Sequence, residues 1–197
     1  MVSATGGLVA AQDLEAAEVG AGILAAGGNA VDAAIATSLA LCALEPWMSG
    51  LGGGGFMVIA AGDGSAPEAI DFGAVAPAGL DPAVYPLAVG RDDDLFGWPA
   101  VLEERNLLGP LSIAVPGQAA GLAAAHRHHG RVPWPELCAP AIGLAARGLP
   151  VTWHATLRIA GAARDLARFA AASSIYLPDG LPPAPSADGT LAHLPLG

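Results

Sequence analysis

The N-terminal part of the chain follows a helical pattern of apolar and polar positions, interrupted by a glycine pair. Between residues 13 and 26 apolar residues recur at helical spacing, with Asp13 placed to cap the helix and the glycines at 27–28 placed to end it. One face of this helix carries Leu14, Ala17, Ala21 and Leu24. A second helix is expected over Asn29–Leu44, capped by its own first residue and favoured by the acidic Asp32 in its first turn. Because it is apolar on nearly every side, we expect it to be buried.

Further along the chain, shorter patterns alternate with turn residues. Pro46 cannot continue the second helix, and a glycine loop follows it. Short apolar runs predict strands at 8–11, 56–60 and 69–72, the second being a candidate for a central strand. Residues 74–111 are rich in proline, lack a clear period, and are expected to form an irregular loop region, functional or mobile. Helices are predicted over 117–129, around 137–147 and over 152–172, before a Pro/Gly-rich tail at 178–197.

The composition narrows the class of protein. Hydrophobic residues make up 53% of the 197 residues, enough for one buried core. All basic residues are arginine, so there is no lysine for a phosphate loop or a Schiff base. The net charge of −10 argues against nucleic acid as a partner, because phosphate contacts need basic side chains. No apolar run is long enough to cross a membrane, and no signal peptide is visible, so we expect a cytoplasmic protein unless an export signal has been removed.

The glycine loop from Gly50 to Gly55 contains the spacing G-x-G-x-x-G, which in dinucleotide-binding proteins joins a strand to a helix. Here the order is reversed, with a helix before the loop and a strand after it, so a nucleotide site is not expected. Its four consecutive glycines are Gly52, Gly53, Gly54 and Gly55. They predict backbone at positive φ or in close approach to another segment or a ligand. Packing alone and the lining of a substrate pocket both fit this pattern.

No set of residues has the spacing of a metal or cofactor site. His126 and His129 share a helix face, but cationic side chains are also favoured at a helix C-terminus, and no carboxylate or thiolate is expected beside them. The acidic run Asp92–Asp94 lacks the glycine and glutamate of a calcium loop. Cys42 and Cys138 lie in apolar helical segments and are expected to be reduced core residues. We therefore expect neither a metal nor a cofactor.

Several short motifs are informative because of their order. The first runs from Gly27 through Glu45-Pro46 and the glycine loop to Ile59. The others are Ile70-Asp71-Phe72, Ala76-Pro77, Ser112–Gly117, Trp134–Leu137, Pro140–Ile142, Gly148–Val151 and Leu177–Pro183. Together, from about Gly7 to Leu194, they resemble the N-terminal part of the large subunit in the γ-glutamyltranspeptidase (glutathione hydrolase) family.

That resemblance implies an α/β fold, the N-terminal part of the helix-rich αββα sandwich of N-terminal-nucleophile (Ntn) hydrolases, with residues 1–197 as a single partial domain. Such enzymes cut their own precursor into a large and a small subunit, and the new N-terminal threonine of the small subunit is the nucleophile. They cleave γ-glutamyl or related acyl amides by acyl transfer to water or an amino acid. The resemblance therefore implies no catalytic residue in this chain. It also implies the small subunit, or C-terminal half of the precursor, as partner and a small-molecule amide as substrate.

The same resemblance places the substrate pocket around Asp71, Phe72 and Gly73, with the glycine loop as a second part of its lining. The family usually has an arginine directly after this strand, and its guanidinium binds the α-carboxylate of the donor through two charged hydrogen bonds. Gly73 stands in that place, so we expect glutamyl donors to be used poorly. The alternatives are a relative with another acyl donor, of the cephalosporin acylase or oxamate amidohydrolase type, and a non-catalytic remnant or binding module.

Overall fold

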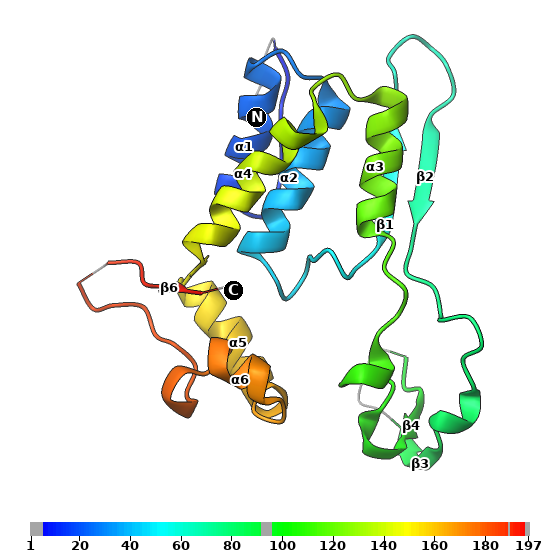
Figure 1. The fold of residues 1–197 in the computed structure, drawn as a ribbon, viewed down its shortest axis with the longest axis vertical. Coiled ribbons are helices and arrows are strands. Elements are labelled where there is room, and N and C mark those ends of the chain that lie inside the picture. Colours follow the sequence, from blue (N-terminus) through cyan, green and yellow to red (C-terminus); the bar gives the residue numbers. More distant parts are fainter. Residues whose placement is uncertain (1–5, 92–95, 189, 196–197) are drawn as a thin grey trace.

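The computed structural model describes residues 6–91, 96–188 and 190–195, which form a helix-rich α/β fold (Figure 1). The α-helices are α1 (Leu14–Ala25), α2 (Ala30–Leu44), α3 (Gln118–His129), α4 (Trp134–Arg147), α5 (Trp153–Leu166) and α6 (Ala170–Tyr176). The strands are β1 (Gly55–Ile59), β2 (Glu68–Phe72), β3 (Leu87–Arg91), β4 (Pro99–Val101), β5 (Leu149–Pro150) and β6 (His193–Leu194). Short 3₁₀ helices lie at Pro82–Val84, Leu102–Glu104, Pro110–Ser112 and Pro178–Gly180. The α/β class expected from the sequence is confirmed.

Both ends of α1 are capped as the sequence predicts. The Asp13 side chain accepts a hydrogen bond from the backbone N–H of Ala16 at 3.1 Å. At the other end, Gly27 has a φ of +94°, and the N–H groups of the glycine pair donate to the carbonyl oxygens of Leu24 and Ile23. This left-handed cap satisfies carbonyl groups that the last turn of a helix cannot satisfy itself.

α1 packs on α2 through its smallest residues, not through the face that carries Leu14. Ala16 and Gly20 are buried, and a Cβ atom at Gly20 would collide with the Thr37 side chain of α2. Leu14, by contrast, is 74% exposed. The distance between two packed helices depends on the side chains at their contact, so a close approach requires small residues there.

Asn29 and Asp32 hold the start of α2 in a reciprocal capping box, in which each side chain accepts from backbone N–H groups of the first turn. The fully buried Asp32 carboxylate also accepts from the backbone N–H of Arg131 at 3.0 Å and of Val132 at 3.4 Å. Asn29 Nδ2 donates to the carbonyl oxygen of His129 at 2.6 Å. These bonds tie the start of α2 to the turn between α3 and α4.

The main core lies between α2, α3 and α4, as the apolar pattern of α2 predicts. Its buried members are Val31, Ile35, Ala36, Leu39, Leu122, Ala125 and Leu137. One face of the β1–β2 sheet adds Met57, Ile59, Ile70 and Phe72 to this core. Figure 1 shows α3 lying alongside these two strands.

The other face of the β1–β2 sheet is not covered by any described residue. The two strands pair in antiparallel register with Phe56 opposite Asp71. Phe56 and Val58 are 76% and 71% exposed. β1 has β2 as its only partner strand among the described residues, so the central position expected for it is not seen there. An apolar sheet face of this kind marks a surface that is suited to packing against another element.

Several boundaries differ from the prediction. No strand is formed at 8–11, and the helix expected at 152–172 is broken at 167–169 into α5 and α6. α4 begins three residues early, because Pro133 and Pro135 can occupy its start, and Pro140 lies inside it. The region 74–111 contains β3 and β4 as well as 3₁₀ turns, so it is less irregular than predicted.

The capping box yields a stability prediction. Replacing Asp32 with alanine should lower the free energy of unfolding by about 3 kcal/mol, because several backbone N–H groups lose a charged acceptor in a buried position. Urea denaturation followed by circular dichroism measures the change. Asp81→Ala is the matched control, since the exposed Asp81 accepts one local bond from Ala83, and it should cost about 0.5 kcal/mol or less. Equal losses in the two variants would contradict the assigned role.

Candidate functional site

The residues named from the sequence lie at the end of β2. The exposed Asp71 side chain accepts a hydrogen bond from the backbone N–H of Gly73 at 2.9 Å, which turns the chain directly after the strand. Since Asp71 pairs with Phe56, it belongs to the uncovered sheet face. Phe72 belongs to the opposite face and packs in the core. The three adjacent residues therefore contribute differently to the site. Asp71 offers an exposed carboxylate, Phe72 a ring packed in the core, and Gly73 a backbone position without a side chain.

Glycines from two other segments surround Phe72. A Cβ atom on Gly121 of α3 would collide with the Phe72 ring, and one on Gly117 would collide with the Phe72 carbonyl oxygen. On the β1 side, a Cβ atom on Gly55 would come within 3.0 Å of the ring. The position of Phe72, and hence of the backbone at Gly73, is fixed by these close contacts with residues that have no side chain.

The glycine loop meets this strand end at Gly54. A Cβ atom there would lie 2.6 Å from the backbone nitrogen of Ala74 and 2.7 Å from the Phe72 carbonyl oxygen. No glycine of the loop has a positive φ. Of the two reasons proposed for the glycines, close approach therefore holds at Gly54, and positive φ is wrong.

The glycine loop also hydrogen-bonds to the N-terminus of α3. The carbonyl oxygen of Gly53 accepts from the N–H groups of Gly117 and Gln118 at 2.9 and 3.0 Å. Helix N-termini that bind phosphate offer these same N–H groups to the ligand. In this chain they are already bonded to protein, which agrees with the reading that the G-x-G-x-x-G spacing is not a nucleotide site.

The segment after Gly73 is also held by backbone pairing with the residues that precede α3. Val75 and Val115 exchange two backbone hydrogen bonds, with Val75 N donating at 3.3 Å and Val115 N at 2.8 Å. Directly beyond lies a cavity of about 300 Å³. Its lining is mainly apolar and includes Val75, Leu80, Tyr85, Leu111 and Ile113. This cavity lies within and after the 74–111 region, parts of which we expect from the sequence to line the pocket. Residues of the motifs Ala76-Pro77 and Ser112–Gly117 are among its lining.

No arginine among the described residues takes the place of the one that the family pattern has after the strand. Arg91, the nearest in sequence, donates to the carbonyl oxygen of Gly97 at 2.6 Å. The charged group that contacts Gly73 is instead the negative carboxylate of Asp71. Gly73 itself has room for a side chain, because its φ is not positive and a Cβ atom would meet only Asp71 Oδ1, at 3.3 Å.

The two histidines considered as metal ligands, His126 and His129, bind different partners and do not converge on one site. The His126 ring bonds the carbonyl oxygen of Val132 at 2.7 Å, whereas the His129 ring bonds Glu68 at 3.0 Å. The expectation that no carboxylate lies beside these histidines is therefore wrong for His129, because the β1–β2 sheet brings Glu68 next to α3. No group of three metal-binding side chains occurs in the described part of the chain. Cys42 and Cys138 are free thiols, and burial raises the pKa of both. The acidic run at 92–94 lies outside the described residues.

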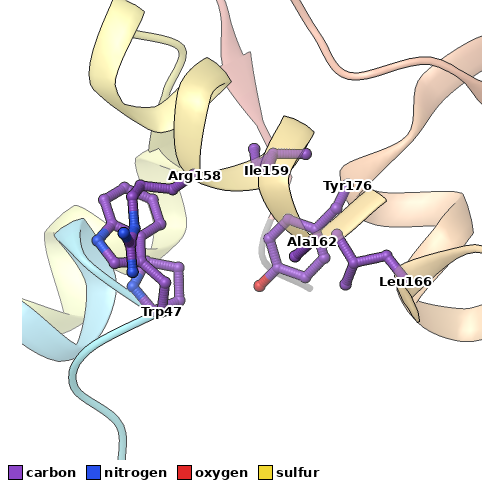
Figure 2. Close-up of a pocket in the computed structure, with 7 residues that line it drawn as sticks. Trp47, Arg158, Ile159, Ala162, Leu166 and Tyr176 are labelled. Atoms are coloured by element: carbon purple, nitrogen blue, oxygen red, sulfur yellow. The ribbon is translucent and has the colours of Figure 1, made fainter. Parts of the chain in front are cut away.

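A second pocket joins residues that are far apart in the sequence. Trp47 follows α2, Arg158 lies on α5 and Tyr176 ends α6, and together they line a cavity of about 380 Å³ (Figure 2). Trp47 precedes Arg158 and Tyr176 by more than a hundred positions, so no sequence motif revealed this pocket.

Comparison with known proteins matches residues 16–193 to the family described as Gamma-glutamyltranspeptidase. The chain is 42% identical over 146 residues to the "Glutathione hydrolase proenzyme" of Pseudomonas aeruginosa, covering 74% of this chain and 24% of that protein. It is 37% identical over 183 residues to the "Acylase ACY 1 proenzyme" of Pseudomonas sp. (strain SE83), covering 91% and 32%. Among solved structures it resembles the γ-glutamyltranspeptidase of Helicobacter pylori, with a TM-score of 0.82, 27% identity and coverage of 98% of this chain and 52% of that chain.

The chain thus spans about a quarter to a third of the length of these curated relatives. Its α/β fold is that of the N-terminal part of the Ntn-hydrolase sandwich, as the sequence predicted. None of the helices in the described ranges is long and apolar enough to cross a membrane.

The glycine loop supplies a matched pair of variants. Gly54→Ala should destabilise the protein by about 1–3 kcal/mol, because its Cβ atom has to displace backbone at Phe72 and Ala74. Gly52→Ala should be nearly neutral, since a Cβ atom there meets nothing within 4 Å and its φ is not positive. Thermal unfolding of both variants measures the difference. Equal tolerance of alanine at the two positions would show that the close approach at Gly54 is not required.

Proposed function

This chain belongs to the γ-glutamyltranspeptidase family, and we propose that it forms the N-terminal part of the large subunit of a self-processing amidohydrolase. Members of the family are hydrolases and transferases. We assign the nucleophilic threonine to polypeptide outside residues 1–197, because the chain covers 52% of the solved relative from Helicobacter pylori and corresponds to the N-terminal part of the large subunit in the family pattern. The word "proenzyme" in the names of two relatives supports self-processing.

The uncovered sheet face supports a protein partner. Phe56 and Val58 form an apolar surface on the side of the sheet that the helices leave open. In an αββα sandwich a second sheet packs on that side. The partner that we propose is therefore the catalytic half of the hydrolase, and the role of this chain is to complete the core and to shape the acyl-donor pocket.

The geometry after β2 is the observation that carries the substrate proposal. Gly73 offers no guanidinium, its N–H is bonded to Asp71, and the Asp71 carboxylate disfavours a second negative charge nearby. The adjoining cavity is mainly apolar. These features support an acyl donor without a free α-carboxylate, and the similarity to an acylase agrees with that choice.

The alternative to a large-subunit fragment is a non-catalytic binding module. The two can be distinguished by whether the isolated chain self-associates. An exposed apolar sheet face and open strand edges favour association. In sedimentation velocity the chain alone should form oligomers, and the double variant Phe56→Ser, Val58→Ser should shift it towards monomer. Val89→Ser, which alters an exposed apolar residue outside this face, is the control and should change nothing. A chain that is monomeric and melts cooperatively without substitution would favour the module.

The acyl-donor proposal is tested on the complete protein that carries this chain, with acyl p-nitroanilides as substrates. Butyryl-p-nitroanilide should be hydrolysed with a higher kcat/KM than γ-glutamyl-p-nitroanilide. If the rest of the pocket accepts glutamate, Gly73→Arg should reduce the ratio of the two kcat/KM values by about 10–100-fold. The reason is that hydrogen bonds to charged groups contribute about 1.5–3 kcal/mol.

Gly73→Gln is the matched variant, because glutamine adds length without charge and should leave the preference unchanged. Efficient hydrolysis of γ-glutamyl-p-nitroanilide by the unsubstituted protein would overturn the donor assignment. Absence of hydrolysis of every amide, in a protein whose polypeptide has been cleaved before a threonine, would overturn the proposed activity.

A further inference from the structure

The pocket between the end of α2 and helices α5 and α6 has an apolar body and three polar groups at its rim. Pro46, Ile159, Ala162 and Leu166 contribute the apolar walls. In Figure 2 Trp47 and Arg158 lie on one side, Tyr176 and Leu166 on the other, and the Tyr176 hydroxyl points into the space between them. Its volume of about 380 Å³ is within the range of small-ligand pockets, about 300–1,000 Å³.

All three polar groups are hydrogen-bond donors, and none has an acceptor among the described residues. The Trp47 Nε1 atom is buried without a partner. Neither the Arg158 guanidinium nor the Tyr176 hydroxyl makes a hydrogen bond or an ion pair within the part of the chain that the structure describes. Burial raises the pKa of the Tyr176 hydroxyl, so the group keeps its proton at neutral pH and can donate a hydrogen bond. A buried donor without an acceptor costs about 1–3 kcal/mol, and this cost applies to Trp47 Nε1. Arg158 is exposed and Tyr176 is partly buried, so they add a charge and a hydroxyl group beside the unsatisfied donor. Together these groups favour an acceptor-rich ligand.

The pocket is built on a packed cluster of side chains. Leu149, Val151, Ile159, Leu177 and Leu194 form this cluster, and the Trp47 and Tyr176 side chains pack against it. The His154 ring lies edge-on to Trp47, with ring centroids 5.4 Å apart. Both aromatic walls are therefore held by neighbours, and a ligand would meet a largely preformed site.

The charge of Arg158 also acts on a buried carboxyl group. Glu45 is 5% exposed. Burial raises its pKa and Asp13 raises it further, whereas His154 and Arg158 lower it. Arg158 makes no ion pair with Glu45 within 4 Å, so its N–H groups remain available while its positive charge is partly balanced. One guanidinium in a chain of net charge −10 suits a monoanion better than a phosphate dianion.

We propose that this pocket binds a small organic monocarboxylate with an aromatic or branched apolar body. Its carboxylate would lie on Arg158 and the unpartnered Nε1 of Trp47, with the Tyr176 hydroxyl facing it across the pocket, and its body would lie against Ile159 and Leu166. The site is separate from the proposed acyl-donor pocket, because none of Asp71, Phe72, Gly73 or the glycines at 52–55 lines it. It extends the proposed function by a second ligand site on the same chain.

The test compares phenylacetate with phenylacetamide by isothermal titration calorimetry on the full 197-residue chain at low ionic strength. The two probes share the phenyl ring and differ in the carboxylate. Phenylacetate should bind at least about tenfold more tightly, because a charged pair of hydrogen bonds is worth at least about 1.4 kcal/mol. Inorganic phosphate at the same concentration should not displace it.

Arg158→Gln should weaken phenylacetate binding by about tenfold or more, and Tyr176→Phe by a smaller factor. Arg164→Gln is the control, because Arg164 lies on the same helix and does not line the pocket; its affinity should be unchanged. Equal binding of acid and amide, displacement by phosphate, or an unchanged Arg158→Gln variant would overturn the proposal. So would the absence of phenylacetate binding at 10 mM, a concentration on the order of that needed to detect a weak site. The acid–amide comparison uses the unsubstituted chain and therefore stands even if a variant fails to fold.

Discussion

The buried Asp32 carboxylate is the interaction on which the rest of the structure depends. It caps α2 from within and binds the backbone of Arg131 and Val132 in the turn between α3 and α4. That turn sets where α3 lies, and α3 carries Gly121, whose missing side chain leaves room for the Phe72 ring. The position of Gly73 thus follows, step by step, from a hydrogen-bonded carboxylate at the opposite end of the helices. Buried carboxylates persist only when such partners compensate for lost hydration.

The same arrangement leaves only one face of the β1–β2 sheet covered by helices. Helices cover the face with Met57 and Ile70, while Phe56 and Val58 face outwards. A chain of the γ-glutamyltranspeptidase family with one helical layer and one exposed sheet face has the form of half a sandwich. The acyl-donor pocket that we propose lies at an edge of this sheet, where both halves of such an enzyme would contribute residues.

Much of this could be predicted because the signals are local. Asp13, Asn29 and the glycine pair fix helix ends through bonds to nearby backbone, and short apolar runs mark β1 and β2. Other features depend on distant contacts. The packed face of α1 is decided by how close α2 comes, and the need for glycine at Gly54 by the backbone of Ala74. The pocket of Trp47, Arg158 and Tyr176 assembles three separate segments, so no window of sequence contains it.

The central claim is that this chain works as the N-terminal part of the large subunit of a self-processing hydrolase. It is tested most directly by mass spectrometry and N-terminal sequencing of the polypeptides that co-purify with these residues from their native source. The account predicts a second polypeptide that begins with threonine and is encoded in the same precursor. A single uncleaved polypeptide, or no partner with an N-terminal threonine, would contradict it.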